Sequence, residues 1–504
     1  MESVKDYLRK KGPSLSSDIT EYLISKHGIL PATARQRVSR ASKEILKLEL
    51  SFPRNAKFLF LREQSGSDKY WSNLVNALLK TKSAYGYALT SLMARDGITP
   101  LHHFDIVCGA PIKQKKHLST NTILQRLLQV NLIKTIDVPK IGNCVYIGFH
   151  SNHVEDLFPQ LKARLLAEDI LLRGFSSWLK RNNFISYNQV KTREQEPLPI
   201  VSTTAWDLCG PSYLSPLIAF NPGDTKPKPG FVTCDVLIKP MVSKNDLQPY
   251  IQKVKALRGL KNVGKSLHFF IAYKYSEEAF ALLKGEGISP ATIDSIFGKE
   301  VSNGISHILN IFTEIIPNSG LDLASLDKIY NILGKVEGAA SRIRGVFFEY
   351  LAAEVIRTLF TYHSINMNYI CKTENGQKEA DIVYVTKNNQ VIFVEAKGYN
   401  PRTLITEKEV NYWLTEQVPI FYKYCQNHPD WKNKKLVFKY WTTSDFNEGA
   451  LLLLNKMKNQ VSPKKYTLEY SNGSDIQKII KDTDNSQLND IYNTHYMKHP
   501  FNKI

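Results

Sequence analysis

The chain has 504 residues, 43% of them hydrophobic and 11% aromatic, so it is long enough for several folded domains and too apolar for a disordered protein. Its 66 lysines and arginines against 47 acidic residues give a net charge of +19, which indicates a polyanionic partner, most simply nucleic acid. No apolar run could span a bilayer, and the charged start MESVKDYLRKKG lacks a signal peptide's apolar centre. The six cysteines form no C-x-x-C pair. We therefore expect a cytoplasmic protein without membrane partner, disulfide scaffold or zinc site.

Residues 1–65 have the pattern of three helices followed by a β-hairpin. A first helix is predicted at Val4 to Lys11, Ser16 or Ser17 can cap a second, and Thr33 can cap a third. The segment LELSFPRNAKFLFL then predicts two strands around a Pro-Arg-Asn turn. These elements form a winged helix-turn-helix domain. Basic side chains outnumber acidic ones about two to one in this segment, which favours DNA binding over protein contacts, the other common use of this fold.

The third predicted helix has one apolar face and several polar ones. Ala34, Val38, Ala41 and Ile45 share the apolar face. Guanidinium groups match phosphates and guanine edges, and glutamine can read adenine, so the polar faces suit a recognition helix. The predicted DNA contacts are Arg35, Gln36, Arg37, Ser39, Arg40 and Lys43.

Residues 66–152 repeat this pattern. Helices are predicted at 70–82, 88–96 and 119–129, and a strand, a Lys-Ile-Gly-Asn turn and a strand follow within 135–149. We interpret the segment as a second winged helix. Its third helix has fewer charges than that of the first domain. It either reads bases through Asn121, Thr122 or Gln125, or it only packs.

Residues 153–335 alternate helices and strands. A long helix at 161–180 is followed by a strand at 230–239, a helix at 246–259, a strand at 266–273 and a helix at 276–287. The same order of elements occurs again in residues 336–504. Gly259 to Ser266 spell the phosphate-binding motif G-x-x-x-x-G-K-S, but they follow a helix and precede a strand, which is the reverse of a P-loop. We therefore expect no bound nucleotide.

Residues 378–399 contain the chain's strongest chemical signal. Two apolar runs, Asp381 to Val385 and Val391 to Val394, predict a hairpin with charged residues at one end. Asp381 opens the first strand, and Glu395 and Lys397 close the second on one face. Two carboxylates and an ammonium at one end of a sheet are costly unless a cation binds there, and carboxylate oxygens suit Mg²⁺.

The Asp381, Glu395-x-Lys397 pattern resembles the PD-(D/E)XK nuclease superfamily, which has the restriction-endonuclease-like fold. The order of the surrounding elements matches the family's αβββαβ core: a helix at 346–360, the hairpin, a helix at 406–425 and a strand at 435–441. The following TTSDF and the helix from Asn447 are similar to the ending of the Mrr-type branch. Ala380 stands where the family name has proline, at a position that varies in the family.

The resemblance implies a site and a reaction. Mg²⁺, for which Mn²⁺ can substitute, is expected on Asp381, Glu395 and the carbonyl of Ala396, and Glu349 completes this site or a second one. Lys397 is expected to position the attacking water. Cleavage leaves 5′-phosphate and 3′-hydroxyl ends, and Gln417 on the next helix is expected to contact DNA.

The resemblance also bears on the middle segment. Its element order suggests a second restriction-endonuclease-like domain that has lost its site. At the place of Glu395-Ala396-Lys397 it has Asp235-Val236-Leu237, and Asp207 stands at the first acid position. One intact acid position, with no lysine at the place of Lys397, cannot assemble the same chemistry, so a structural or DNA-positioning role is favoured.

The sequence therefore predicts a multidomain α/β and α+β protein: winged helices at 1–65 and 66–152, a degenerate nuclease-like domain at 153–335 and a nuclease domain with a C-terminal tail at 336–504. The predicted function is Mg²⁺-dependent cleavage of double-stranded DNA in restriction or anti-phage defence. One site cuts one strand, so we expect a homodimer. The alternatives are a structure-specific nuclease for junctions, flaps or transposon ends, and a non-catalytic DNA-binding protein on a nuclease-like scaffold; an RNA substrate also stays open.

Overall fold

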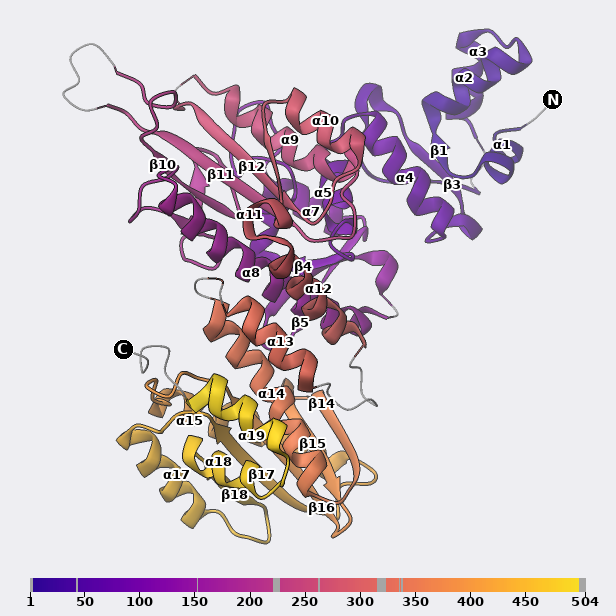
Figure 1. Cartoon of the computed structure of the whole chain (residues 1–504). Helices are drawn as coiled ribbons and strands as arrows, with labels where there is room; N and C mark the ends of the chain where they lie inside the picture. The colour runs from indigo at the N-terminus through magenta and orange to yellow at the C-terminus, as the bar shows by residue number, and fades with distance from the viewer. Residues whose placement is uncertain are drawn as a thin grey trace. The chain divides into compact units, whose positions relative to one another are not determined.

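The computed structural model describes residues 3–41, 44–151, 153–220, 227–261, 263–314, 323–334, 336 and 339–497. The described strands form two five-stranded sheets, two three-stranded sheets and one two-stranded sheet, with helices between them (Figure 1). This mixture confirms the predicted combination of α and β structure in several sheets. The chain divides into two compact units, which we call unit 1 (Met1–Leu161 with Phe175–Ile296) and unit 2 (Lys162–Gly174 with Phe297–Ile504). No helix in the described ranges is both long and apolar enough to cross a membrane.

Unit 1 begins with three helices and a small antiparallel sheet of order β1-β3-β2. The elements are α1 (Val4–Lys11), β1 (Ser14–Leu15), α2 (Ser16–His27), α3 (Pro31–Ser39), β2 (Ile45–Lys47), the 3-10 turn η1 (Pro53–Asn55) and β3 (Phe58–Leu61). The predicted serine and threonine caps are wrong: Leu15 precedes α2 and Leu30 precedes α3, without a capping side chain. Proline at the start of α3 fixes a helical φ, which explains the earlier start.

A second group of helices follows, with an antiparallel sheet of order β4-β6-β5. The helices and strands are α4 (Asp68–Lys80), α5 (Ala84–Met93), β4 (Ile98–Pro100), α6 (Phe104–Val107), α7 (Thr120–Gln129), β5 (Ile133–Val138) and β6 (Gly142–Ile147). The short 3-10 turns of this region are η2 (Arg62–Gln64), η3 (Leu101–His103), η4 (Gly148–His150) and η5 (Val154–Leu157). The three helices and two strands that the sequence predicts here are present. The bounds of α7 agree within one residue, and the other elements begin two or more residues earlier than predicted.

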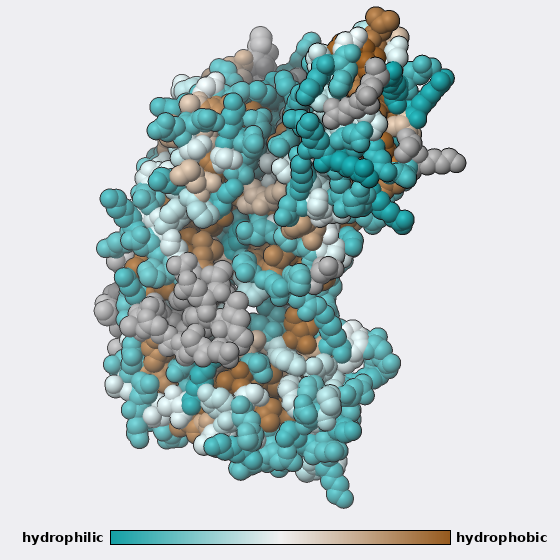
Figure 2. All heavy atoms as spheres, turned by 90° about the vertical axis from the view of Figure 1, so that its right-hand side faces the viewer, coloured by the Kyte–Doolittle hydropathy of each residue, from teal (hydrophilic) through white to brown (hydrophobic). Residues whose placement is uncertain are grey.

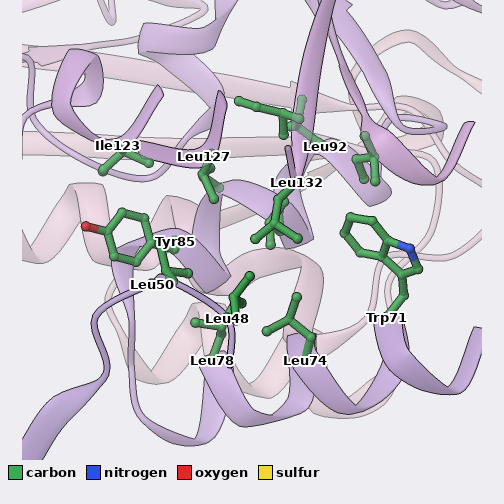
Figure 3. Packing of buried hydrophobic residues seen from close by; sticks show 14 of the residues in the cluster. Leu48, Leu50, Trp71, Leu74, Leu78, Tyr85, Leu92, Ile123, Leu127 and Leu132 are labelled. Atoms are coloured by element: carbon green, nitrogen blue, oxygen red, sulfur yellow. The ribbon is translucent and has the colours of Figure 1, made fainter. Parts of the chain in front are cut away.

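The first group has a buried cluster of its own, and a second cluster joins it to the other group. Figure 3 shows Leu48 and Leu50, which lie between β2 and η1, beside Leu74 and Leu78 of α4. Tyr85 of α5 and residues of α7 belong to the same buried cluster. Burial of each large apolar side chain stabilises the folded state by about 1.5–3 kcal/mol. Leu48 and Leu50 of the first group therefore hold it against the second group.

A five-stranded sheet of order β13-β12-β11-β10-β7 completes unit 1. Its elements are α8 (Phe158–Arg181), β7 (Lys191–Thr192), β10 (Leu208–Ser212), β11 (Gly230–Leu237), α9 (Lys244–Arg258), β12 (Ser266–Ala272), α10 (Glu277–Gly285), β13 (Ser289–Thr292) and α11 (Ile293–Phe297), with the small hairpin β8 (Ile200–Val201) and β9 (Thr204–Ala205). The P-loop-like sequence joins α9 to β12, so helix precedes strand as predicted. The middle residues of α8 belong to unit 2.

Unit 2 contains the other five-stranded sheet, of order β14-β15-β16-β17-β18. Its elements are α12 (Lys299–Glu314), α13 (Leu323–Leu333), α14 (Ala339–Leu359), β14 (Tyr362–Thr373), β15 (Gly376–Thr386), β16 (Gln390–Lys397), α15 (Glu407–Tyr412), the π-helix η6 (Trp413–Gln417), α16 (Val418–Asn427), β17 (Lys435–Thr442), α17 (Glu448–Gln460), β18 (Thr467–Ser471), α18 (Gly473–Lys481), α19 (Ser486–Tyr492) and a terminal π-helix η7 (Asn493–Met497).

The two five-stranded sheets have the same topology. In each sheet, the first three of its strands in chain order pair antiparallel, and the last three pair parallel. In each sheet a parallel bridge joins the residues that precede the two crossover helices. In unit 1 Val242, before the capping box of α9, pairs with Tyr275, before α10; in unit 2 Ile405, before the capping box of α15, pairs with Phe446, before α17. The repeated element order that the sequence suggests is therefore present in three dimensions.

Helices cover both faces of the unit 2 sheet. Val383, Val385 and Phe393 face the core that contains Trp413 and Phe421 of the η6–α16 region. On the other side α14 packs against β14, β15 and β16, and the ring of Phe360 at its end lies 6.0 Å from that of Tyr384. Since side chains alternate along a strand, β15 and β16 are apolar on both faces except at one end.

On the face of the protein shown in Figure 2, hydrophilic residues predominate.

Candidate active site

The charged end of the hairpin lies where the β15–β16 ladder stops. The last paired residues are Ile382 and Val394. The next position along each strand is Asp381 on β15 and Glu395 on β16, so the two acids stand opposite each other and face the same side of the sheet. Asp381 is 0% exposed and Glu395 is 4% exposed. The structure therefore brings the two predicted acids together in a buried position.

Asp381 takes over the hydrogen bond that a continuing ladder would make. The backbone N–H of Ala396 donates to Asp381 Oδ2 at 2.7 Å. In a strand the N–H and C=O of one residue point the same way, so the carbonyl of Ala396 also points toward the Asp381 side. The three predicted ligands on the hairpin, two carboxylates and this carbonyl, thus converge on the opening between the strands.

Lys397 lies two residues after Glu395 and faces the same side. Its Nζ is 2.5 Å from Glu395 Oε1, and its side chain is 27% exposed. The ammonium therefore lies at the boundary between the buried acids and solvent.

Gln417 holds the second oxygen of Glu395. Its Nε2 donates to Glu395 Oε2 at 3.2 Å, and the residue is 7% exposed. The sequence predicts Gln417 as a DNA contact on one continuous helix, whereas the structure places it at the end of the π-helix η6, buried against an acid. A π-helical turn inserts one extra residue and is frequent at functional sites. Gln417 lies at the end of this turn, where its amide reaches Glu395.

Glu349 lies in the middle of α14, which begins seven residues earlier than predicted. The helix passes close to the residue after Lys397: a Cβ on Gly398 would lie 2.6 Å from Cβ of Phe348, the neighbour of Glu349. Glycine at position 398 is what permits this approach. Glu349 is half-buried, on the part of α14 beside the end of β16.

Two tyrosines lie near Glu395 and Lys397. The Tyr399 hydroxyl donates to Glu409 Oε1 at 2.7 Å, and burial together with this acceptor raises the pKa of Tyr399 to about 12. Burial also raises the pKa of Tyr440 on β17, which lies beside Glu395 in the parallel ladder of β16 and β17. Both phenols stay neutral near pH 7, so they add no charge to the acid pair.

The donor set suits Mg²⁺. No group of three or more His, Cys, Asp or Glu side chains among the described residues could enclose a metal ion. Mg²⁺ is commonly held by only one or two carboxylates and keeps several waters, which leaves room for a phosphate. Asp381 and Glu395 carry two negative charges and Lys397 one positive charge, so a divalent cation would be attracted by the remaining charge.

The predicted recognition residues of the first helical group lie on the surface. Arg35, Gln36, Arg37 and Ser39 are exposed on α3, and Arg40 follows its end. A groove of about 810 Å³ beside α3 is lined in part by Gln36, Arg37 and Arg40. Lys43 lies outside the described residues.

In the second helical group Asn121 and Gln125 are exposed on α7, four residues apart and thus on one face. Ser119 accepts a hydrogen bond from the Thr122 N–H and fixes the start of this helix. Whether α7 reads bases stays a prediction.

The comparisons with known proteins add no relative: no family model, no curated protein and no solved structure matches the chain.

Proposed function

We propose that the chain is a Mg²⁺-dependent DNA endonuclease with a PD-(D/E)XK, Mrr-like catalytic domain and two N-terminal winged helices. The observation that carries the proposal is the Asp381–Glu395 pair, buried at the open end of a ladder with Lys397 beside it. Two carboxylates buried this deeply are costly unless cations neutralise them. A site that attracts a divalent cation and opens to solvent through a lysine would be suited to phosphodiester hydrolysis.

The residues divide the chemistry. Asp381, Glu395 and the Ala396 carbonyl would hold the metal, whereas Glu349 on α14 forms no group of three metal-ligating acids with them in the described part of the chain. The bound Mg²⁺ would supply Lewis-acid stabilisation of the charge on the phosphate. Lys397 would orient the attacking water at the solvent boundary, because its ammonium is the partly exposed member of the set. Gln417 keeps Glu395 in one orientation.

DNA binding is assigned to unit 1. The net charge of +19 favours a polyanion, and the exposed guanidinium groups of Arg35, Arg37 and Arg40 suit the phosphates and base edges of double-stranded DNA. Separate regions for recognition and cleavage are the arrangement of many restriction enzymes, so we propose restriction or anti-phage defence as the biological role. Because one site cuts one strand, cleavage of both strands would use a homodimer.

The test is cleavage of a long, sequence-diverse duplex DNA by the full chain, with Mg²⁺ and with EDTA. We expect cleavage that needs Mg²⁺ and is lost in Asp381→Ala, while Asp430→Ala, which changes an exposed acid of the same unit, cuts like the parent. Discrete fragments would show sequence specificity, and their ends would give the recognition site.

Two results would contradict the proposal. Cleavage that persists in Asp381→Ala would place the chemistry elsewhere. Salt-sensitive DNA binding without cleavage of linear, branched or flapped substrates would identify a non-catalytic DNA-binding protein on a nuclease-like scaffold.

A further inference from the structure

The sheet of unit 1 contains a second carboxylate pair at the same ladder position. Its β10–β11 ladder ends at Leu208 and Cys234. The next residues are Asp207 and Asp235, which stand opposite each other as the acids of unit 2 do. Asp207 is 0% exposed and Asp235 is 3% exposed. The equivalence follows from strand register alone.

The backbone contact of the pair is repeated as well. The N–H of Val236 donates to Asp207 Oδ2 at 2.8 Å, as the N–H of Ala396 donates to Asp381 Oδ2 at 2.7 Å. Asp207 also donates its own N–H to Asp235 Oδ1 at 3.1 Å. Both acid positions of this sheet are therefore intact in geometry.

The strand has Leu237 at the position of Lys397, as expected, but a lysine reaches the site from helix α9, which the sequence pattern does not reveal. Lys253 of α9 places its Nζ 2.5 Å from Asp235 Oδ2. It lies eleven residues after the bridge residue Val242, and Gln417 lies twelve residues after the corresponding Ile405. The extra residue in unit 2 is accommodated by its π-helical turn. Lys253 thus occupies the place of Gln417, not that of Lys397.

The ammonium of Lys253 is enclosed. It donates to the backbone oxygen of Ile106 at 2.8 Å and lies 4.4 Å from the ring centre of Trp206. The residue is 1% exposed. A carboxylate, a carbonyl and an aromatic face are all favourable neighbours for a desolvated cation.

The other two oxygen positions of the site also hold cationic side chains. Arg193 Nη1 donates to Asp207 Oδ1 at 2.9 Å. Arg95 Nη2 donates to the carbonyl of Val236 at 3.3 Å, which is the position of the Ala396 carbonyl in the other sheet. Each group that corresponds to a proposed Mg²⁺ ligand is therefore bonded to a lysine or an arginine of the chain.

Some of these bonding groups belong to the elements that pack over the end of the unit 1 sheet. Ile106 belongs to α6 and Arg95 follows α5, both from residues 66–152. Gly109, with φ +78°, lies against α9 so closely that a Cβ would be 2.8 Å from Cα of Pro249. The second helical group therefore covers this end of the unit 1 sheet, whereas at the equivalent end of the unit 2 sheet Lys397 is partly exposed.

We propose that the carboxylate pair of unit 1 is a metal-free counterpart of the unit 2 site, in which Lys253, Arg193 and Arg95 replace a divalent cation. This charge cluster binds residues 66–152 to the sheet. Unit 1 accordingly holds no divalent cation at this carboxylate pair and performs no cleavage there. The inference does not depend on whether the chain cuts DNA.

The test counts Mn²⁺ bound per full-length chain by calorimetry and by the paramagnetic resonance of free Mn²⁺. The starting variant is Asp381→Asn with Glu395→Gln, which removes the unit 2 acids, so that any remaining specific site belongs elsewhere. We expect this variant to bind no Mn²⁺ that depends on Asp235. One Mn²⁺ per chain that is lost when Asp235→Asn is added would overturn the proposal.

A second measurement covers the outcome that Asp235→Asn alone fails to fold. The pair Asp235→Asn with Lys253→Met removes both charges together and is compared with the wild-type chain. We expect the same number of Mn²⁺ ions per chain in both proteins, whether that number is one or, if unit 2 binds no metal, zero. A lower number in the double variant would show that unit 1 holds a metal. Failure of the proposed nuclease would instead appear as a wild-type chain that neither binds Mn²⁺ through Asp381 nor cuts DNA.

Discussion

The acid pairs of the two sheets differ in where their lysine comes from. In unit 2 Lys397 follows Glu395 on the same strand and is 27% exposed, whereas in unit 1 Lys253 comes from the crossover helix and its side chain is 1% exposed. A lysine at the strand end can exchange its carboxylate contact for water or phosphate. A lysine enclosed by a carbonyl and an indole cannot. The same strand register can therefore support a cation site or an internal ion pair.

Desolvation explains why the enclosed pair matters for stability. Burial raises the pKa of Asp235 to about 6, while the ammonium of Lys253 opposes that rise. A buried ion pair gains little over an apolar pair of the same shape, but removal of one partner leaves an uncompensated charge. The comparison therefore predicts effects on cleavage in unit 2 and effects on stability in unit 1.

The largest expected effect is on cleavage. Asp381→Asn should lower the single-turnover cleavage rate about 1000-fold, because loss of one group that stabilises transition-state charge typically costs about 100- to 1000-fold and a metal ligand is lost as well. The equivalent change in unit 1, Asp207→Asn, should leave the rate of the folded protein unchanged. Equal losses in the two variants would mean that both sheets take part in the chemistry.

Lys253→Met should lower the free energy of unfolding by about 3–5 kcal/mol, since it leaves Asp235 buried without its partner. Urea unfolding of the full chain checks this. Lys255→Met, on the same helix but in an exposed pair with Glu286, is the matched control and should change little. Addition of Asp235→Asn to Lys253→Met should restore part of the loss. A double variant as unstable as the sum of the single changes would show that the two residues are not coupled.

The deficit of Lys253→Met should depend on pH. Without the ammonium, the native pKa of Asp235 rises further above its unfolded value of 3.8. A raised pKa favours the native state only while the group is protonated, so this contribution is present below about pH 4 and is lost as the pH rises through the native pKa. A tenfold difference in proton affinity between the native and unfolded states corresponds to about 1.4 kcal/mol. Unfolding curves at pH 5 and pH 8 should therefore show a smaller deficit at pH 5; equal deficits would contradict the assignment.

Gln417→Met should lower the cleavage rate about 10-fold, because a hydrogen bond to a charged group contributes about 1.5–3 kcal/mol and only part of it acts on the reaction. DNA affinity should stay unchanged, and the Mg²⁺ concentration for half-maximal cleavage should rise, since Gln417 positions Glu395. Gln417→Glu, which keeps the shape but adds a charge next to Glu395, should be worse than the methionine variant. A change in DNA affinity alone would return Gln417 to the role of a DNA contact.

The smallest effect is expected on the recognition helix. Arg37→Ala should weaken binding of duplex DNA and reduce the slope of log affinity against log salt by about one, the amount for one phosphate contact. Lys464→Ala, an exposed basic residue of unit 2, is the control and should leave the slope unchanged. An unchanged slope in both variants would remove α3 from the proposed DNA surface.

Most elements are predictable from local patterns. The predicted bounds of β11, β12, β16 and β17 agree with the structure within two residues, because each strand is a β-branched, apolar run between turn residues. The starts of α2 and α3 differ from the prediction because backbone and tertiary contacts can replace a capping side chain. The π-turn of η6 escapes prediction because one inserted residue does not change an apolar helical period enough to be read from sequence.

The order of amino acids alone is enough to bring the unit 2 acids together: Asp381, Glu395 and Lys397 are close along the chain, so strand periodicity and one hairpin suffice. The tertiary structure determines which cation each pair holds. Lys253 and Gln417 reach their acids from crossover helices, and Arg95 and Ile106 reach the unit 1 site from another group of helices. Such contacts join residues far apart in the chain, and they depend on how helices pack on the sheet. Only the packed structure therefore distinguishes the proposed open metal site from its closed counterpart.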